Sequence, residues 1–217
     1  MRVSEIFRSI QGEGMRIGRP SIFVRLGTCN LNCLWCDTKY AQTEWNEIGV
    51  NEIAQKVLEM CLPGDNLVIT GGEPMLQREQ LEILVQILRE HFEVIEIETN
   101  GSIEPTLELI SDDKVYWNVS PKLSNSGNIQ YRIPRCYILC SRSIFKFVVR
   151  TEGDIDEINT YIKMNNIPPK KVFLMPECTS KETHEKRLAI SVELAKKFGY
   201  NVTPRLQILL YGNRRGV

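Results

Sequence analysis

The sequence is poor in histidine, with only His91 and His184. His91 falls on the polar face of a predicted helix and His184 lies among charged residues, so we expect both to be solvated. The shortage argues against a Ser-His-Asp or Cys-His hydrolase, because those mechanisms use histidine as the general base. It also argues against a histidine-rich zinc site. Other groups must therefore carry the chemistry of this chain.

The 217 residues also lack an excess of charge and any long apolar run. Lys plus Arg and Asp plus Glu number 27 each, so nothing points to nucleic acid or an anionic membrane as a partner. No run approaches the ~18 apolar residues of a membrane span. Glu5, Arg8 and Gln11 interrupt the region where a signal peptide would be apolar. We expect a cytoplasmic protein that binds neither nucleic acid nor membrane.

Short β-rich runs alternate with helical stretches from residue 21 onward, which predicts a parallel sheet wound with helices. The predicted strands are 21–26, 66–70, 94–99, 114–119, 144–149, 171–175 and 206–211. The predicted helices are 50–61, 77–92, 154–166 and 181–199. The chain is shorter than the ~250 residues of an eight-unit barrel. We therefore expect an α/β fold, an open, partial parallel β/α barrel in a single domain over 1–217.

Two irregular segments, 27–49 and 120–143, interrupt this alternation, and the first holds three of the seven cysteines. Cys29, Cys33 and Cys36 follow a predicted strand with C-x3-C-x2-C spacing. A structural zinc site normally takes four ligands in two separated pairs, and a disulfide framework needs an even set in a secreted chain. Three thiolates instead fit a [4Fe–4S] cluster whose fourth iron is free for a substrate or cofactor.

A zinc knuckle that uses a distant fourth cysteine is the alternative reading of this spacing. Its candidate fourth ligands are Cys61, Cys136, Cys140 and Cys178.

Small or polar motifs end three further predicted strands: TGGEP at 70–74, ETNGS at 98–102 and SPK at 120–122. Loops after strand carboxyl ends carry the chemistry of parallel α/β folds, so we expect these motifs to lie near the cysteines. The two glycines of TGGEP allow a close backbone approach to a ligand. Glu73 offers a carboxylate to an ammonium group.

With this spacing and these motifs the chain resembles the radical S-adenosylmethionine superfamily. The resemblance implies that the amino and carboxylate groups of S-adenosylmethionine chelate the free iron, and that the GGEP stretch binds the amino group. It implies about six core strands in a barrel of the radical S-adenosylmethionine type. The implied cofactor-binding residues are Gly72, Glu73, Ser120, Pro121 and Lys122.

Two segments point to one family within this superfamily: residues 8–38 and the ending RLQILLYGNRRGV. Over nearly its whole length the chain is similar to the 7-carboxy-7-deazaguanine synthases, radical enzymes on the route to deazapurine nucleosides such as queuosine. This similarity implies that Thr38 holds Mg²⁺ beside the substrate. Arg25 suits a carboxylated substrate, because guanidinium binds carboxylate through two parallel hydrogen bonds. The implied pterin-binding residues are Ile10, Gln11, Gly12, Arg25 and Thr70.

The resemblance also implies a reaction. A reduced cluster cleaves S-adenosylmethionine, and the resulting 5′-deoxyadenosyl radical removes a hydrogen from carbon 6 of 6-carboxy-5,6,7,8-tetrahydropterin. The ring then contracts to the deazapurine, ammonia leaves and S-adenosylmethionine is re-formed. Flavodoxin or ferredoxin as electron donor, and a homodimer, are further implications. Candidates for additional cofactor or substrate contacts are Met175, Pro176, Glu177 and Cys178.

Two other functions stay open at this point. One is an activating enzyme for a glycyl-radical protein, which would act on a polypeptide. The other is a zinc-stabilised interaction module without catalysis.

Overall fold

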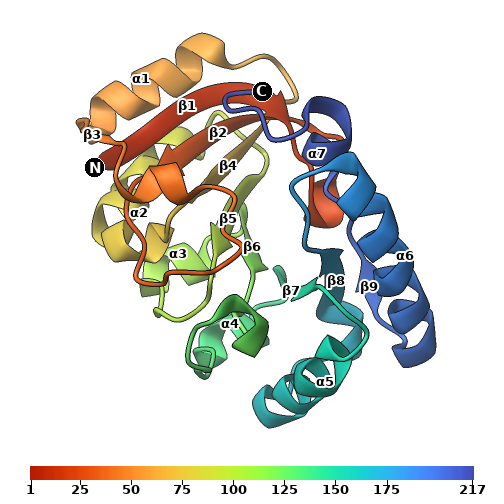
Figure 1. Cartoon of the computed structure of the whole chain (residues 1–217). Helices are drawn as coiled ribbons and strands as arrows, with labels where there is room; N and C mark the ends of the chain where they lie inside the picture. Colours follow the sequence, from red (N-terminus) through yellow and green to blue (C-terminus); the bar gives the residue numbers. More distant parts are fainter.

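The computed structural model describes all residues from 1 to 217, and they form one nine-stranded sheet with helices along its outer face (Figure 1). The strand order is β3-β1-β2-β4-β5-β6-β7-β8-β9. The strands are β1 (Arg2–Ile10), β2 (Pro20–Leu26), β3 (Asn46–Glu47), β4 (Asn66–Gly71), β5 (Ile95–Thr99), β6 (Val115–Val119), β7 (Ser143–Val149), β8 (Val172–Pro176) and β9 (Asn201–Val202).

The sheet is parallel from β2 to β9, whereas β1 runs antiparallel to both β2 and β3. The edge strands β3 and β9 do not pair with each other, so the sheet stays open. This confirms the predicted open, partial parallel barrel. The expected core strands are β2, β4, β5, β6, β7 and β8, and the short β9 extends them.

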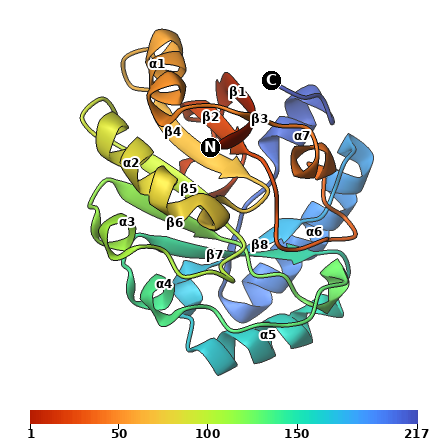
Figure 2. The same ribbon diagram turned by 90° about the vertical axis from the view of Figure 1, so that its left-hand side faces the viewer.

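Helices cover the outer side of the curved sheet, as Figure 2 shows for α1 to α6. The helices are α1 (Val50–Met60), α2 (Arg78–Leu88), α3 (Leu107–Ser111), α4 (Arg135–Leu139), α5 (Asp154–Asn165), α6 (Lys181–Phe198) and α7 (Leu206–Tyr211). Short 3-10 turns add η1 (Gly14–Arg16), η2 (Lys39–Gln42), η3 (Pro74–Gln77), η4 (Ser124–Ser126) and η5 (Pro169–Lys171). None of the helices combines the length and the apolarity needed to cross a bilayer.

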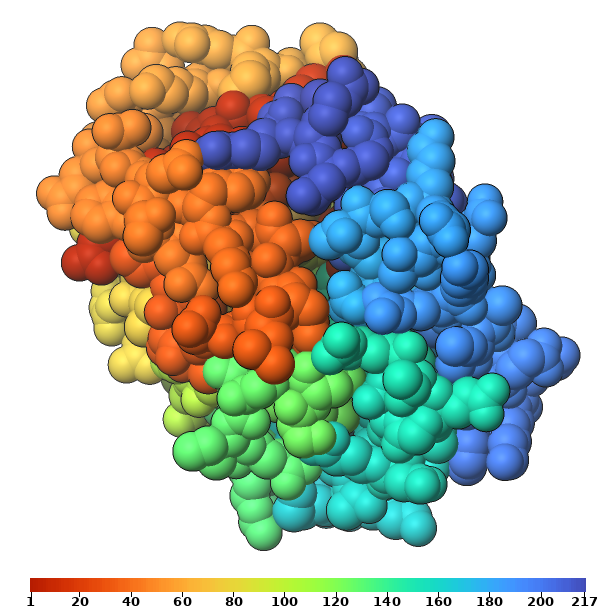
Figure 3. All heavy atoms as spheres, viewed as in Figure 1, coloured from red at the N-terminus to blue at the C-terminus, as the bar shows by residue number.

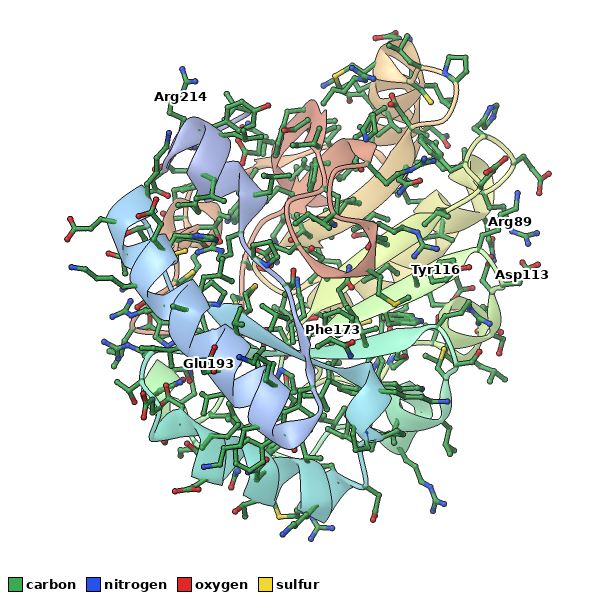
Figure 4. All side chains as sticks on the ribbon, turned by 90° about the vertical axis from the view of Figure 1, so that its right-hand side faces the viewer. Arg89, Asp113, Tyr116, Phe173, Glu193 and Arg214 are labelled. Atoms are coloured by element: carbon green, nitrogen blue, oxygen red, sulfur yellow. The ribbon has the colours of Figure 1, made fainter.

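One continuous apolar core lies between the sheet and these helices. Helix α2 shows why: Leu81, Leu84, Val85 and Leu88 are buried at the i, i+3, i+4, i+7 positions of one helical face. The exposed positions of α2 are mostly polar. Figure 4 shows Arg89 and Asp113 side by side at the outer edge, with 3.3 Å between Arg89 Nη2 and Asp113 Oδ1. Exposed ion pairs of this kind stabilise a fold little.

The predicted strand at 206–211 is wrong, because Leu206–Tyr211 forms helix α7. A short apolar run suits a strand or a buried helix equally well, and its periodicity cannot separate them. Here only Ile208 is buried, and the helix ends at Gly212 with φ of 64°. The segment therefore caps the barrel and does not extend the sheet.

The prediction for His184 is also wrong, whereas His91 is exposed as predicted. His184 is 1% exposed, and its Nε2 accepts a hydrogen bond of 3.0 Å from the backbone N–H of Arg205. Burial lowers the pKa of His184, and the neighbouring Arg205 lowers it further. This histidine is therefore a neutral structural acceptor.

Candidate active site

A cavity of ≈ 390 Å³ lies at the carboxyl ends of the parallel strands and extends into the barrel. Its size is typical of small-molecule sites. Its walls come from the strand ends, from the cluster loop (residues 27–49) and from the last residues of the chain. In Figure 3 the orange cluster loop adjoins the dark-blue C-terminal residues on this face.

The structure brings most of the predicted site residues to this cavity. Glu73 and Pro121 are the exceptions, since neither lines it. Those that do are Ile10, Gln11, Gly12, Arg25, Cys29, Cys33, Cys36, Thr38, Thr70, Gly72, Ser120 and Lys122. Their individual roles stay predictions.

Cys29, Cys33 and Cys36 are free cysteines, and a polar group lies beside each sulfur. The backbone N–H of Leu31 donates to Cys29 Sγ at 3.5 Å, and Thr38 Oγ1 lies 3.7 Å from Cys36 Sγ. Burial raises the pKa of Cys29 and that of Cys33. A bound metal centre would supply the positive charge that holds such buried thiols as thiolates.

The donor set fits an iron–sulfur cluster better than a zinc ion. No three His, Cys, Asp or Glu side chains are arranged to hold one metal ion, as a tetrahedral site with Zn–S bonds of about 2.3 Å would require. The cysteines of a cluster bind different iron atoms, so they need not converge on one point. The cysteines outside the cavity lining are Cys61, Cys136, Cys140 and Cys178.

The GGEP turn packs directly on the cluster loop. A Cβ atom on Gly72 would lie 1.7 Å from the Thr28 carbonyl oxygen, so only glycine fits here. Glu73 is fully buried, and its carboxylate accepts hydrogen bonds from Thr99 Oγ1 (2.6 Å) and the Asn100 N–H (2.7 Å). Glu73 therefore fastens the GGEP turn to the TNG turn. Its direct contact with an ammonium group stays a prediction.

The SPK segment is tied to the TNG turn and lies beside the cluster loop. Lys122 Nζ donates to Ser120 Oγ at 2.7 Å and lies 5.3 Å from the centre of the Trp35 ring. Tyr131, which sequence reasoning missed, donates its hydroxyl to the Asn100 carbonyl (2.7 Å) and accepts from the Lys122 N–H (3.1 Å). One hydroxyl group thus sets the separation between two strand-end loops.

Arg25 lies on the cavity wall with one side of its guanidinium occupied. Its Nε donates to Glu5 Oε1 at 2.6 Å, and Tyr40 donates its hydroxyl to the same oxygen at 2.7 Å. The two terminal nitrogens of Arg25 have no hydrogen-bond partner in the protein. The guanidinium therefore presents two free donors to the cavity, which suits a carboxylate. Thr70 lies beside Arg25 on the neighbouring strand.

A buried charge network at the base of the cavity was missed by sequence reasoning. Lys146 Nζ lies 2.9 Å from Glu13 Oε2 and 3.5 Å from Glu98 Oε1, while Arg205 pairs with Glu13 (3.0 Å) and Asp37. Burial alone would raise the pKa of Glu13, but Lys146 and Arg205 hold it well below its usual range. The available signal was Lys146 itself, a charge inside the apolar strand run IFKFVV.

The end of the chain covers one side of the cavity. Residues 211–217 line it, and Arg215 lies 3.6 Å from the centre of the Tyr40 ring and donates to Glu44 at 2.8 Å. The C-terminal segment is thereby attached to the cluster loop. From the segment 174–180 the cavity takes Met175, Pro176 and Glu177, whereas Cys178 is buried elsewhere.

The sequence matches known proteins over its whole length. Residues 24–127 match the model of the radical SAM superfamily. The chain is 43% identical to a 7-carboxy-7-deazaguanine synthase of Pyrobaculum aerophilum, over 100% of this chain and 97% of that relative. It is 35% identical to a 7-carboxy-7-deazaguanine synthase of Hyperthermus butylicus, over 97% of this chain and 92% of the relative. The chain belongs to the 7-carboxy-7-deazaguanine synthase family.

Solved structures agree with the fold of this family member. QueE from Escherichia coli matches with a TM-score of 0.73 at 23% identity, over 93% of this chain and 92% of that one. Native anSMEcpe with bound AdoMet and Cp18Cys peptide matches with a TM-score of 0.57 at 16% identity, over 86% of this chain and 64% of that one. Both likenesses confirm the open barrel.

Membership of the 7-carboxy-7-deazaguanine synthase family settles the class of the protein. It is a radical S-adenosylmethionine enzyme, and that superfamily uses a [4Fe–4S] cluster and S-adenosylmethionine. The zinc-stabilised module and the glycyl-radical activating enzyme are thereby both set aside.

Proposed function

We propose that the protein converts 6-carboxy-5,6,7,8-tetrahydropterin to 7-carboxy-7-deazaguanine, with loss of ammonia, in queuosine-type deazapurine biosynthesis. The proposal rests on the side chains that line one cavity. The cavity has three free cysteines on one wall and, on another, Arg25 with two unpaired nitrogens. A cluster, a cofactor and a carboxylated substrate thus have matching partners within the same space.

Cys29, Cys33 and Cys36 would hold the cluster, and Gly72, Ser120 and Lys122 line the part of the cavity assigned to S-adenosylmethionine. When bound, these two groups would supply the radical chemistry that removes a hydrogen from carbon 6 of the pterin. The protein contributes orientation and the exclusion of water. Glu73 serves this arrangement from outside the cavity by holding two strand-end turns together, and Pro121 by stiffening the SPK segment.

The substrate half of the cavity would be lined by Arg25, Thr70 and the backbone from Ile10 to Gly12. Arg25 would bind the carboxylate through its two free nitrogens. The amino and ring N–H groups of a pterin are donors, and Glu98 offers carboxylate oxygens toward them from the cavity wall. Thr70 donates to Glu98 at 2.9 Å and so orients that carboxylate.

We also propose Mg²⁺ as a third cofactor, with Thr38 as a ligand. Thr38 lines the cavity, and its hydroxyl oxygen lies 3.7 Å from Cys36 Sγ. Mg²⁺ takes few protein ligands and completes its octahedron with waters and substrate oxygens. A single hydroxyl is therefore a sufficient protein contribution when the substrate carries a carboxylate.

The remaining proposals concern partners and organisation. The single continuous core supports one radical S-adenosylmethionine domain over residues 1–217. Flavodoxin or ferredoxin as the electron donor, and a homodimer as the assembly, follow from the family resemblance. Sedimentation of the reconstituted protein would test the dimer.

Anaerobic turnover tests the proposed function. The reconstituted protein is incubated with the carboxylated tetrahydropterin, S-adenosylmethionine, Mg²⁺ and a reductant, and the product is identified by its mass. We expect one 7-carboxy-7-deazaguanine and one ammonia for each pterin consumed. Cleavage of S-adenosylmethionine without any deazapurine would reject the assigned substrate.

A further inference from the structure

The turn that follows the SPK segment lies against the cluster loop. The Ser126 carbonyl accepts from the Leu34 N–H at 2.9 Å, and the Asn125 carbonyl accepts from Trp35 Nε1 at 2.9 Å. Gly127 has φ of 78°, and a Cβ there would lie 2.8 Å from Leu34 Cγ. This turn, residues 124–128, therefore packs closely on the chain between the cluster cysteines.

The same turn is anchored to the barrel. Ser124 donates its backbone N–H to Glu157 of α5 at 3.0 Å, and Asn125 Nδ2 donates to the Val148 carbonyl of β7 at 3.0 Å. The turn is thus a fixed support, and groups on it have defined positions relative to the cysteines.

Asn128 extends from this turn to a cluster ligand. Its Nδ2 donates to Cys33 Sγ at 3.2 Å and to Ser126 Oγ at 3.0 Å, and its Oδ1 accepts from the Asn32 N–H at 3.2 Å. Only an oxygen accepts from that backbone N–H, so the amide orientation is fixed with its NH₂ group toward the sulfur. Asn128 provides the one side-chain N–H that bonds to a cluster cysteine.

A hydrogen bond to a cluster sulfur changes the ease of reduction. Reduction adds negative charge to the cluster and its thiolates, and an N–H dipole aimed at the sulfur stabilises that charge. Hydrogen bonds to the sulfurs are accordingly one of the factors that set cluster potentials. Cys33 is the most buried of the three cysteines, at 8% exposed, so water competes little for its sulfur.

We propose that Asn128 sets the reduction potential of the cluster through its hydrogen bond to Cys33. The inference rests on the proposed assignment of Cys29, Cys33 and Cys36 as the cluster ligands. In this role Asn128 raises the potential and brings the cluster within reach of its electron donor. Asn128 itself does not line the cavity.

A reductive titration followed by electron paramagnetic resonance tests this role. The wild type is compared with Asn128→Leu, which keeps a similar volume and removes the donor. The matched control is Asn125→Leu, which removes an amide hydrogen bond from the same turn without touching a sulfur. We expect the equilibrium constant for one-electron reduction to fall about tenfold in Asn128→Leu, a shift of about 59 mV to more negative potential. The control should keep the wild-type potential.

A second variant, Asn128→Asp, replaces the donor with a negatively charged acceptor and should shift the potential further in the same direction. Wild-type potentials in both Asn128 variants, or an equal shift in the control, would overturn the proposal. If neither variant retains iron, electron-nuclear double resonance of the wild type with ¹⁵N-asparagine decides. A coupling to a side-chain ¹⁵N is expected, and its absence refutes the bond. A wild type that binds no cluster would instead contradict the cluster assignment.

Discussion

Replacement of Arg25 by alanine separates substrate binding from cofactor chemistry. The Arg25 side chain is only 16% exposed, so a carboxylate bound to it is largely removed from water. Such a pair differs from an exposed ion pair, which contributes ~0–1 kcal/mol. Loss of one partner of a desolvated, hydrogen-bonded charge pair costs about 2–5 kcal/mol. The KM for the carboxylated pterin should therefore rise roughly 30-fold or more.

The test becomes specific when two pterins are compared and when cofactor cleavage is measured apart from product formation. A tetrahydropterin without the 6-carboxyl group should bind wild type and Arg25→Ala equally, because it lacks the group that Arg25 holds. Cleavage of S-adenosylmethionine without product should survive in the variant. Arg25→Ala also leaves Glu5 with Tyr40 alone, so the assays belong at a temperature well below unfolding. If the variant lost affinity for both pterins equally, or lost cofactor binding, Arg25 would not be the carboxylate site.

Thr38→Ala should keep the cluster and still cleave S-adenosylmethionine. It should form product slowly and need more Mg²⁺, because an octahedral ion loses one ligand. Thr38→Ser should restore much of the rate. Unchanged Mg²⁺ dependence in Thr38→Ala would refute the role. Alanine at any one of the three cluster cysteines should abolish iron binding, whereas Cys140→Ala should leave the iron content unchanged. If Cys140→Ala lost as much iron as the cluster-cysteine variants, the three-ligand assignment would be refuted. Tyr131→Phe should raise the KM for S-adenosylmethionine about tenfold, because its hydroxyl makes two hydrogen bonds of ~0.5–1.5 kcal/mol each. The control Tyr161→Phe also removes a buried hydroxyl, which bonds the Tyr131 carbonyl, and should destabilise the fold without changing that KM.

Local patterns predicted the parallel part of the fold well. The strand runs from 21–26 to 171–175 each agree with an observed strand to within one residue at both ends. These strands are buried on both faces, so continuous β-branched and aromatic runs mark them clearly. The motifs at their carboxyl ends could be placed together for the same reason, since parallel strands end at one edge of a sheet.

Features that depend on distant contacts were not predictable in this way. The antiparallel strand β1 has a mixed burial pattern and no distinctive alternation. Helix α7 is too short for its period to be read. The charge network joins Glu13, Asp37, Lys146 and Arg205, which meet only after the sheet has curved. His184 looked solvated because its sequence neighbours are charged, whereas its actual partner is the backbone of Arg205.

In the proposed function, one cavity holds cluster, cofactor and pterin so that the hydrogen on carbon 6 is the atom removed. The most direct measurement uses the pterin deuterated at carbon 6, in anaerobic turnover with S-adenosylmethionine and Mg²⁺. We expect deuterium on the 5′ carbon of the recovered S-adenosylmethionine, in step with formation of 7-carboxy-7-deazaguanine. Product formation with no deuterium in the recovered cofactor would contradict it.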